Sequence, residues 1–279
     1  MMRRVALSDG AELAVWEDGP ADAPALIFLH GFPENHRAWR HQIAHLAPRY
    51  RCIAPDLRGY GASSKPSDYT LPRLVRDVLE LADALEVDRF TLLGHDWGGL
   101  LAWAVAEASD RLDRLVIANA PHPALFQNLL WRDPAQRAAS AYITLFRDPA
   151  LDATIAEHGL APVLAQAFGG NALRTMEREE LGTLLTQWRD PDTARAMLAW
   201  YRASPVEVAP HAATLPAQPI PIPTLVLWGE ADDALLPANL DGLDAICPTL
   251  TLRRLPGVGH FSPWAAPTQV NAALDAFLR

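Results

Sequence analysis

Cysteine is scarce in this chain of 279 residues, which contains only Cys52 and Cys247. The two cysteines lie far apart in the sequence, and each stands beside apolar residues. This spacing argues against a disulfide framework and favours a reducing compartment. We predict that both thiols are buried and chemically inert.

Lysine is rarer still, because Lys65 is the only one, and the arginines are scattered among acidic residues. The formal net charge of the chain is −9. Nucleic-acid binding depends on clustered basic side chains that neutralise phosphates. We therefore expect no nucleic-acid partner.

Long apolar runs are also lacking. No uncharged apolar stretch approaches the roughly 20 residues that a bilayer-spanning helix needs. The first stretch of the chain, MMRRVALSDGAEL, has arginines but no apolar core of a signal peptide. We expect no membrane span and a cytoplasmic protein.

Hydrophobic residues make up 50% of the chain, and many of them fall into short runs. Six runs are rich in Val, Ile and Leu without strict alternation, which is typical of strands covered on both faces. They are ALIFLH (25–30), RCIAPD (51–56), RFTLLG (89–94), RLVIAN (114–119), PTLVLW (223–228) and LTLRRL (250–255). Segments 72–86, 97–109 and 266–278 have helical spacing and suit crossover connections. The pattern predicts a parallel α/β sheet flanked by helices.

The alternation of strand and helix stops between positions 121 and 218. Helical patterns follow one another there without a strand-like run, in AQRAASAYITLF, LDATIAEHGLAPVLAQAF, REELGTLLTQW and TARAMLAWYRA. A proline-rich stretch, APHAATLPAQPIPIP, then leads back into the next strand-like run. We predict a helical lid (cap), 121–218, inserted after about the sixth strand into a core formed by 1–120 and 219–279.

The ends of the predicted strands carry polar residues. In open parallel sheets, ligands bind beyond the carboxyl ends of the strands. The residues at or just after those ends are His30, Asp56, Asp96, Asn119, Asp232 and His260. A lid that begins after RLVIAN covers the same edge of the sheet, so we expect the functional site there.

Asp96 lies at the centre of LLGHDWGG (92–99), where a serine is more usual. Gly94, Asp96 and Gly98 match the pattern G-x-Nu-x-G, which resembles the nucleophile elbow of the α/β-hydrolase fold. A carboxylate forms a stable ester only by attacking a saturated carbon with a strained or good leaving group. Asp96 therefore predicts displacement at an epoxide carbon or at a carbon bearing halogen. An aspartate before a helix is also a common N-cap, and that interpretation stays open here.

An ester on Asp96 needs a base for its hydrolysis, and His260 in GVGHFSPW is the best placed of the nine histidines. Asp232, in WGEADDALLP, is predicted to orient the imidazole. The chain order Asp96, Asp232, His260 matches the nucleophile, acid and histidine order of the fold. Taken singly, Asp232 could serve only a turn and His260 could be a loop or core histidine.

An oxyanion develops during ester hydrolysis, and two preorganised donors are needed to receive it. We predict that these are the backbone N–H groups of Trp97, next to the nucleophile, and Phe32, in the loop after ALIFLHG. His30 is expected to stabilise that loop. Asp56 and Arg58 in DLRGYGASSKP are expected to form a structural turn.

Motifs along nearly the whole chain carry a family resemblance. They are HGFPE (30–34), DLRGYGASSKP (56–66), GHDWGG (94–99), NAPHP (119–123), WGEADDALLP (228–237) and GHFSPWAAPTQVN (259–271). In these motifs the chain resembles epoxide hydrolases of the α/β-hydrolase superfamily. The resemblance implies a mostly parallel eight-stranded sheet with an inserted helical lid, and it implies neither a metal nor an organic cofactor. GHDWGG alone does not separate epoxide hydrolases from haloalkane dehalogenases.

The lid separates the two chemistries, because an epoxide oxygen leaves as an alkoxide and needs acidic O–H donors, whereas a halide needs N–H groups and ring edges. The resemblance places one tyrosine at Tyr142 and a second at Tyr201. By sequence alone, both could equally be packing residues. Phe32 stands where haloalkane dehalogenases typically have asparagine. Tyr142 and Ile143 stand where fluoroacetate dehalogenases typically have a His-Trp pair.

The resemblance implies hydrolysis of a small epoxide to a vicinal diol. Tyr142 and Tyr201 would hold the epoxide oxygen while Asp96 opens the ring, and His260, oriented by Asp232, would then activate water against the ester. A largely apolar substrate is inferred from aromatic lid residues, namely Phe126, Trp131, Phe146, Phe168, Trp188 and Trp200. A haloalkane or haloacid dehalogenase with the same nucleophile is the first alternative, and a binding protein without turnover is the second. The sequence is compatible with a homodimer.

Overall fold

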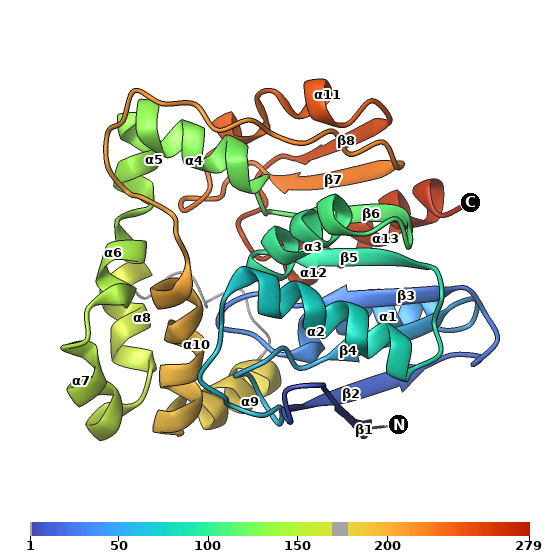
Figure 1. Ribbon diagram of the computed structural model, residues 1–279, viewed down its shortest axis with the longest axis horizontal. Helices are drawn as coiled ribbons and strands as arrows, with labels where there is room; N and C mark the ends of the chain where they lie inside the picture. Colours follow the sequence, from blue (N-terminus) through green and yellow to red (C-terminus); the bar gives the residue numbers. More distant parts are fainter. Residues whose placement is uncertain (1, 169–177) are drawn as a thin grey trace.

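The computed structural model of the protein describes residues 2–168 and 178–279, and eight strands form one sheet (Figure 1). The strand order is β1-β2-β4-β3-β5-β6-β7-β8. The strands are β1 Met2–Ala6, β2 Glu12–Asp18, β3 Ala25–Leu29, β4 Arg51–Pro55, β5 Phe90–His95, β6 Leu112–Ala118, β7 Thr224–Gly229 and β8 Leu250–Leu255. All neighbours from β4 to β8 pair in parallel, whereas β2 pairs antiparallel with both β1 and β4. The mostly parallel eight-stranded sheet is confirmed.

The six strands predicted from apolar runs are β3 to β8. The two N-terminal strands were not predicted from such runs. β1 is an edge strand with a single buried residue and carries no apolar run, and β2 has a run of only four apolar residues, 13–16. A turn signal does mark them: Asp9-Gly10 lies between β1 and β2, with Gly10 at a φ of 84°. That φ is one that glycine adopts without strain.

Helices cover both faces of the sheet, and each strand sends alternate side chains to opposite faces. Ile27 and Leu29 of β3 face one apolar cluster with Leu74 of α2, while Leu26 and Phe28 face a second cluster with Trp39 and Leu274. The helices outside the stretch between β6 and β7 are η1 His36–Trp39, α1 Arg40–Leu46, α2 Leu71–Ala84, α3 Trp97–Ala108, η2 Pro237–Leu240, α11 Leu243–Ile246, α12 Ser262–Ala265 and α13 Pro267–Phe277. Burial on both faces explains the continuous apolar runs of the parallel strands.

Seven helices lie between β6 and β7 in the described part of the chain. They are α4 Pro123–Arg132, α5 Pro134–Ala139, α6 Ala141–Arg147, α7 Leu151–His158, α8 Ala161–Phe168, α9 Arg178–Arg189 and α10 Pro191–Ala203. Figure 1 shows α6, α7, α8 and α10 beside the sheet, at the end toward which the β7 arrow points. The predicted range 121–218 also includes 169–177, which lie outside the described residues. Its status as a separate lid remains a prediction.

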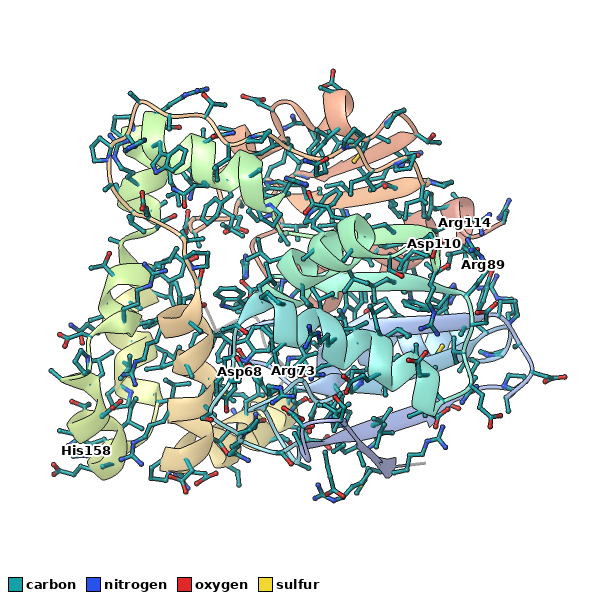
Figure 2. The ribbon with its side chains drawn as sticks, in the orientation of Figure 1. Asp68, Arg73, Arg89, Asp110, Arg114 and His158 are labelled. Carbon is teal, nitrogen blue, oxygen red and sulfur yellow. The ribbon has the colours of Figure 1, made fainter. Side chains whose placement is uncertain are left out.

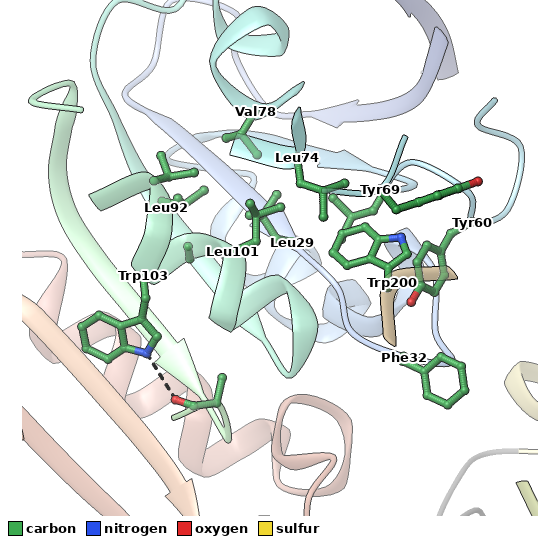
Figure 3. Close-up of a cluster of buried hydrophobic side chains, with 14 of the residues drawn as sticks. Leu29, Phe32, Tyr60, Tyr69, Leu74, Val78, Leu92, Leu101, Trp103 and Trp200 are labelled. Carbon is green, nitrogen blue, oxygen red and sulfur yellow. Dashed lines mark hydrogen bonds between the residues drawn. The ribbon is translucent and has the colours of Figure 1, made fainter. Parts of the chain in front are cut away.

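Two tryptophans dock these helices onto the core. Trp200 of α10 lies in the buried cluster of Figure 3 beside Tyr60, and its indole N–H donates to the carbonyl of Arg58 at 3.0 Å. Trp188 of α9 donates to the carbonyl of Pro33 at 2.8 Å. The inserted helices are thereby fixed to the loops that follow β3 and β4.

Both cysteines are buried and free, as predicted. Burial raises the pKa of Cys52 to about 12 and that of Cys247 to about 11, so neither thiol is reactive at neutral pH. Charges of both signs lie together at the surface, as at the end of the sheet where Figure 2 labels Arg89, Asp110 and Arg114. Within the described residues, no helix has the length and apolarity needed to cross a bilayer.

Candidate active site

Asp96 sits in a strained turn between β5 and α3, with φ 51° and ψ −121°. The turn brings strand and helix so close that a side chain on Gly94 would collide with the backbone of Gly98, and one on Gly98 with the backbone of Leu29. Asp96 occupies the N-cap position of α3, but its side chain makes no capping hydrogen bond. The capping interpretation is therefore excluded, and the strain aims the carboxylate elsewhere.

The Asp96 carboxylate faces the loop after β3. The backbone N–H of Phe32 donates to Asp96 Oδ1 at 2.7 Å. Gly31 is necessary for this approach, because any Cβ there would collide with the Asp96 side chain. The other predicted donor, the N–H of Trp97, stands at the first position of α3, where a helix offers no intrahelical acceptor. The resting carboxylate oxygen thus already contacts one of the two predicted oxyanion donors.

His260 reaches the same carboxylate from the loop after β8. Its Nε2 lies 3.3 Å from Asp96 Oδ2, and its Nδ1 lies 2.7 Å from Asp232 Oδ2. A carboxylate at each ring nitrogen is the arrangement expected of a base and its orienting acid, not of a histidine that only packs in a loop. The structure therefore brings together the three residues that the sequence order predicted.

Asp232 uses its two oxygens for different tasks. Oδ1 accepts hydrogen bonds from the backbone N–H groups of Ala234 and Leu235, both at 2.9 Å. Oδ2 accepts from His260 and from the amide of Asn119 at 2.9 Å. The turn interpretation is thus correct for one oxygen, while the other one holds the imidazole.

The charges around His260 set its protonation. Burial alone lowers the pKa of His260, but the attraction and hydrogen bonds of Asp232 and Asp96 outweigh burial, and the pKa lies well above its usual value. Burial raises the pKa of Asp232, yet His260 and the donors around the carboxylate bring it below its usual value. Asp232 is therefore ionised and able to stabilise a positively charged imidazole.

The sequence pointed to Asn119 only as one of the polar residues at the ends of the predicted strands. In the structure Asn119 holds the predicted acid, because its Nδ2 donates to Asp232 and its Oδ1 accepts from Gly229 N–H at 3.0 Å. Its φ of 42° is one that asparagine tolerates better than most residues. Its place at the end of a central strand was the available signal.

The sequence also missed a hydrogen-bonded group centred on Glu34 and His95, next to Asp96. Glu34 of HGFPE accepts hydrogen bonds from His95 Nδ1 and from the Trp264 indole, both at 2.8 Å. His95 Nε2 contacts the carbonyl of His260 at 3.0 Å. These hydrogen bonds connect the loop after β3, the turn at Asp96 and the loop after β8 that carries His260. Both residues belong to motifs noted in the sequence, HGFPE and GHDWGG, and that could have indicated their part in the site.

Tyr142 of α6 and Tyr201 of α10 line one pocket together with Asp96. Their ring centroids are 6.1 Å apart. Burial, followed by the charge of Asp96, raises the pKa of both phenols. Both phenols of this pocket therefore keep their proton at neutral pH.

The rest of the pocket is nearly all apolar. Its other lining residues are Trp97, Leu100, Pro121, Phe126, Ile143, Ser204, Val206 and Leu235. Of the aromatic residues that suggested an apolar substrate, only Phe126 lines this pocket. Trp188 and Trp200 instead bind the core through their indoles, so they were wrongly grouped with the pocket.

His30 and Asp56 have the structural roles expected of them. His30 Nε2 accepts from the N–H of Leu57 at 3.0 Å, and its Nδ1 contacts the Gly31 carbonyl at 2.9 Å, which fixes the loop after β3. Asp56 accepts from the N–H groups of His36 and Ala62. In the described ranges, no group of three or more His, Cys, Asp or Glu side chains is arranged to hold a metal ion.

Arg58 also has a structural role. Its guanidinium pairs with Asp77 and Asp9 rather than with its turn neighbour Asp56. The expected turn is therefore present, but its two charged residues are held by different partners.

Comparison with known proteins agrees with this geometry. The pattern that defines the alpha/beta hydrolase fold family matches residues 24–267. The chain belongs to the α/β-hydrolase family. Epoxide hydrolase 2 of Caenorhabditis elegans is 32% identical over 94% of this chain and 76% of its own length. Epoxide hydrolase 3 of Xenopus tropicalis is 32% identical over 92% of this chain and 71% of its own length.

Solved structures give the same result. A structure from a study of novel epoxide hydrolases in metagenomes from hot environments is 50% identical, with a TM-score of 0.95, and covers 100% of this chain and 98% of its own. The inhibitor complex of a Bacillus megaterium epoxide hydrolase is 26% identical, with a TM-score of 0.88, over 99% of each chain. Within the α/β hydrolases, the chain is a member of the epoxide hydrolase family.

Proposed function

We propose that this protein hydrolyses small, largely apolar epoxides to vicinal diols through an ester on Asp96. The observation that carries the proposal is the pocket itself. An ionisable carboxylate at the elbow and two protonated phenols, Tyr142 and Tyr201, line one apolar space. An epoxide needs both groups, since one carbon is attacked while the ring oxygen receives a proton.

The first step is alkylation of Asp96. The phenols of Tyr142 and Tyr201 donate hydrogen bonds to the epoxide oxygen, and a carboxylate oxygen of Asp96 attacks one ring carbon. The C–O bond of the ring breaks, a phenol proton passes to the leaving oxygen, and a hydroxyalkyl ester remains. A phenolate formed in this way regains its proton from solvent or from a neighbouring acid.

The second step is hydrolysis of the ester. Esterification removes the negative charge of Asp96, which is one of the causes of the raised pKa of His260. The imidazole can then lose its proton and act as the base that takes a proton from water. Water attacks the carboxyl carbon of Asp96, and the N–H groups of Phe32 and Trp97 receive the oxyanion. The bond between that carbon and the alkyl oxygen then breaks, and the proton that His260 took from water passes to the leaving oxygen, which releases the diol.

The organisation around this site is part of the proposal. We assign 121–218 as the lid over a core of 1–120 and 219–279, because the pocket takes residues from both parts. A cytoplasmic location fits the two free thiols.

The test is an assay of the purified protein with aryl, alkyl and terpene-like epoxides alongside haloalkanes and haloacids. Diol formation without halide release is the expected result. Halide release without diol would replace the proposal by the dehalogenase alternative. Tight binding of epoxides without turnover would identify a binding protein.

A further inference from the structure

Arg147, the last residue of α6, donates three hydrogen bonds, and all three acceptors are main-chain carbonyls. Nε donates to Tyr201 at 2.8 Å, Nη2 to Ser204 at 2.7 Å and Nη1 to Val206 at 2.7 Å. No ion pair joins Arg147 to a carboxylate of the described residues, and burial lowers the pKa of Arg147. A half-buried cation held by neutral acceptors alone indicates a role in geometry, because the planar guanidinium fork fixes direction in a way that an ammonium does not.

The carbonyl of Tyr201 is free to accept this bond because of its place in the helix. The last four carbonyls of an α-helix lack intrahelical partners. Tyr201 lies in the last turn of α10, which ends at Ala203. Arg147 therefore binds the main chain of the residue that carries one of the two proposed proton donors.

The other phenol stands on the same helix as the guanidinium. Tyr142 and Arg147 lie near the start and at the end of α6 (Ala141–Arg147). Phe146 packs against both phenols, with its ring centroid 5.6 Å from that of Tyr142 and 4.9 Å from that of Tyr201. The apolar burial that drives such packing is non-directional, so it sets the register of the two helices less strictly than the three hydrogen bonds of Arg147 do.

We propose that Arg147 is a positioning residue that keeps the phenols of Tyr142 and Tyr201 in register for ring opening. Arg147 is not itself a lining residue of the pocket, and it acts by locking α6 to the end of α10. The same bonds hold Ser204 and Val206, which line the pocket. This inference rests on the proposed function, because it concerns the alkylation step.

The test compares Arg147→Met and Arg147→Lys with the wild type in single-turnover experiments, in which ester formation on Asp96, followed by mass spectrometry of quenched samples, and diol release separate alkylation from ester hydrolysis. Misplacement of a reacting group by about 1 Å can cost on the order of 100-fold in rate. We expect Arg147→Met to slow alkylation by about 10- to 100-fold on this basis. Arg147→Lys should fall between Met and wild type, and ester hydrolysis should keep its wild-type rate.

Arg137→Met is the matched control. Arg137 of α5 also donates to main-chain carbonyls, those of Leu130 and Trp131 at 3.0 Å, but these bonds join α5 to α4 and not α6 to α10. Its alkylation rate should equal that of the wild type. Circular dichroism of every variant before the assay shows that the fold is retained.

A double-mutant comparison separates positioning from general damage. In the Tyr142→Phe/Tyr201→Phe background, adding Arg147→Met should cause no further loss of alkylation, because there is no phenol left to misplace. A further loss as large as in the wild type, or equal slowing of both steps, would overturn the inference. Alkylation by Arg147→Met at the wild-type rate would also overturn the inference. If the wild-type protein itself forms no diol, the proposed function is refuted instead.

Discussion

The triad and the phenol pair are positioned by different kinds of contact. Asp96, Asp232 and His260 follow strands of one sheet. Asp232 has four hydrogen bonds of 2.7 to 2.9 Å, two to each of its carboxylate oxygens. Tyr142 and Tyr201 stand on inserted helices among aromatic rings whose centroids lie between 4.9 and 6.1 Å apart. The sheet fixes the residues proposed to hydrolyse the ester, while the inserted helices, joined by the hydrogen bonds of Arg147, hold the phenols proposed to assist ring opening.

Because the two groups of residues are held by different parts of the fold, the two proposed chemical steps should respond to substitutions in different places. Substitutions at the sheet edge should impair ester hydrolysis, and substitutions in the helices should impair alkylation. Asp96 is the exception, because both steps use its carboxylate. The following substitutions test this division, beginning with the largest expected effect.

Removal of the nucleophile should abolish both steps. We expect Asp96→Ala to lower diol formation by about 10⁴-fold or more, since loss of a central catalytic group usually has this effect. Steady-state diol assays measure it. Asp233→Asn, an exposed neighbour of the triad acid, is the control and should keep wild-type turnover. Substantial turnover by Asp96→Ala would assign the nucleophile elsewhere.

Removal of the base should leave alkylation and stop release. His260→Gln should form one equivalent of ester and then stall, because nothing activates the hydrolytic water. Intact-protein mass spectrometry should show a mass gain equal to one substrate molecule, located on the peptide that contains Asp96. An unmodified variant after long incubation with a reactive epoxide would contradict the division into two steps.

Removal of a phenol should have the opposite profile. Tyr142→Phe and Tyr201→Phe should each slow alkylation by about 10- to 10⁴-fold, the usual range for a general acid, with little change in ester hydrolysis. Single-turnover kinetics resolve the two rates. Tyr50→Phe, a residue packed against the opposite face of the sheet, should change neither rate. If both active-site variants opened epoxides at the wild-type rate, the phenols would be packing residues.

Loss of the Asn119 amide should slow hydrolysis modestly. Asn119→Ala removes one donor to the ionised Asp232, and a hydrogen bond of this kind is worth about 1.5 kcal/mol or more, or roughly tenfold in rate. Alkylation should be unaffected. Asn128→Ala is the control, because Asn128 on α4 also bonds to main chain, at Leu215, yet lies outside the pocket lining. Equal effects of the two substitutions would remove Asn119 from the site.

The smallest effect concerns pH. The raised pKa of His260 means that its interaction with the two carboxylates stabilises the fold fully below the pKa of an unfolded histidine, and this stabilisation is lost as pH rises through the folded-state pKa. Asp96→Asn should lower the pKa of His260, as followed by NMR of the ring protons. Asp96→Asn should lower the free energy of unfolding, relative to the wild type, by more at mildly acidic pH than at alkaline pH. An unchanged His260 titration would show that the two side chains do not interact.

The sequence predicted the features that depend on local pattern. The six buried strands and the elbow at Asp96 follow from apolar runs and glycine spacing, and the acid and base follow from their places after consecutive strands. The bond from Asn119 to Asp232 and the contact of His95 with the His260 carbonyl join segments far apart in the chain, so no local pattern contains them. The register of α6 against α10, set by Arg147, is of the same kind. β1 was missed because an exposed edge strand carries no apolar run.

The most direct test of the account is turnover in water labelled with oxygen-18. The ester route predicts that the first diol molecule carries an unlabelled oxygen from the enzyme, and that repeated turnovers place the label in the carboxylate of Asp96. Mass spectrometry of the peptide that contains Asp96 detects it. A first diol labelled by solvent, together with an unlabelled carboxylate after many turnovers, would contradict the central claim that Asp96 becomes bonded to substrate.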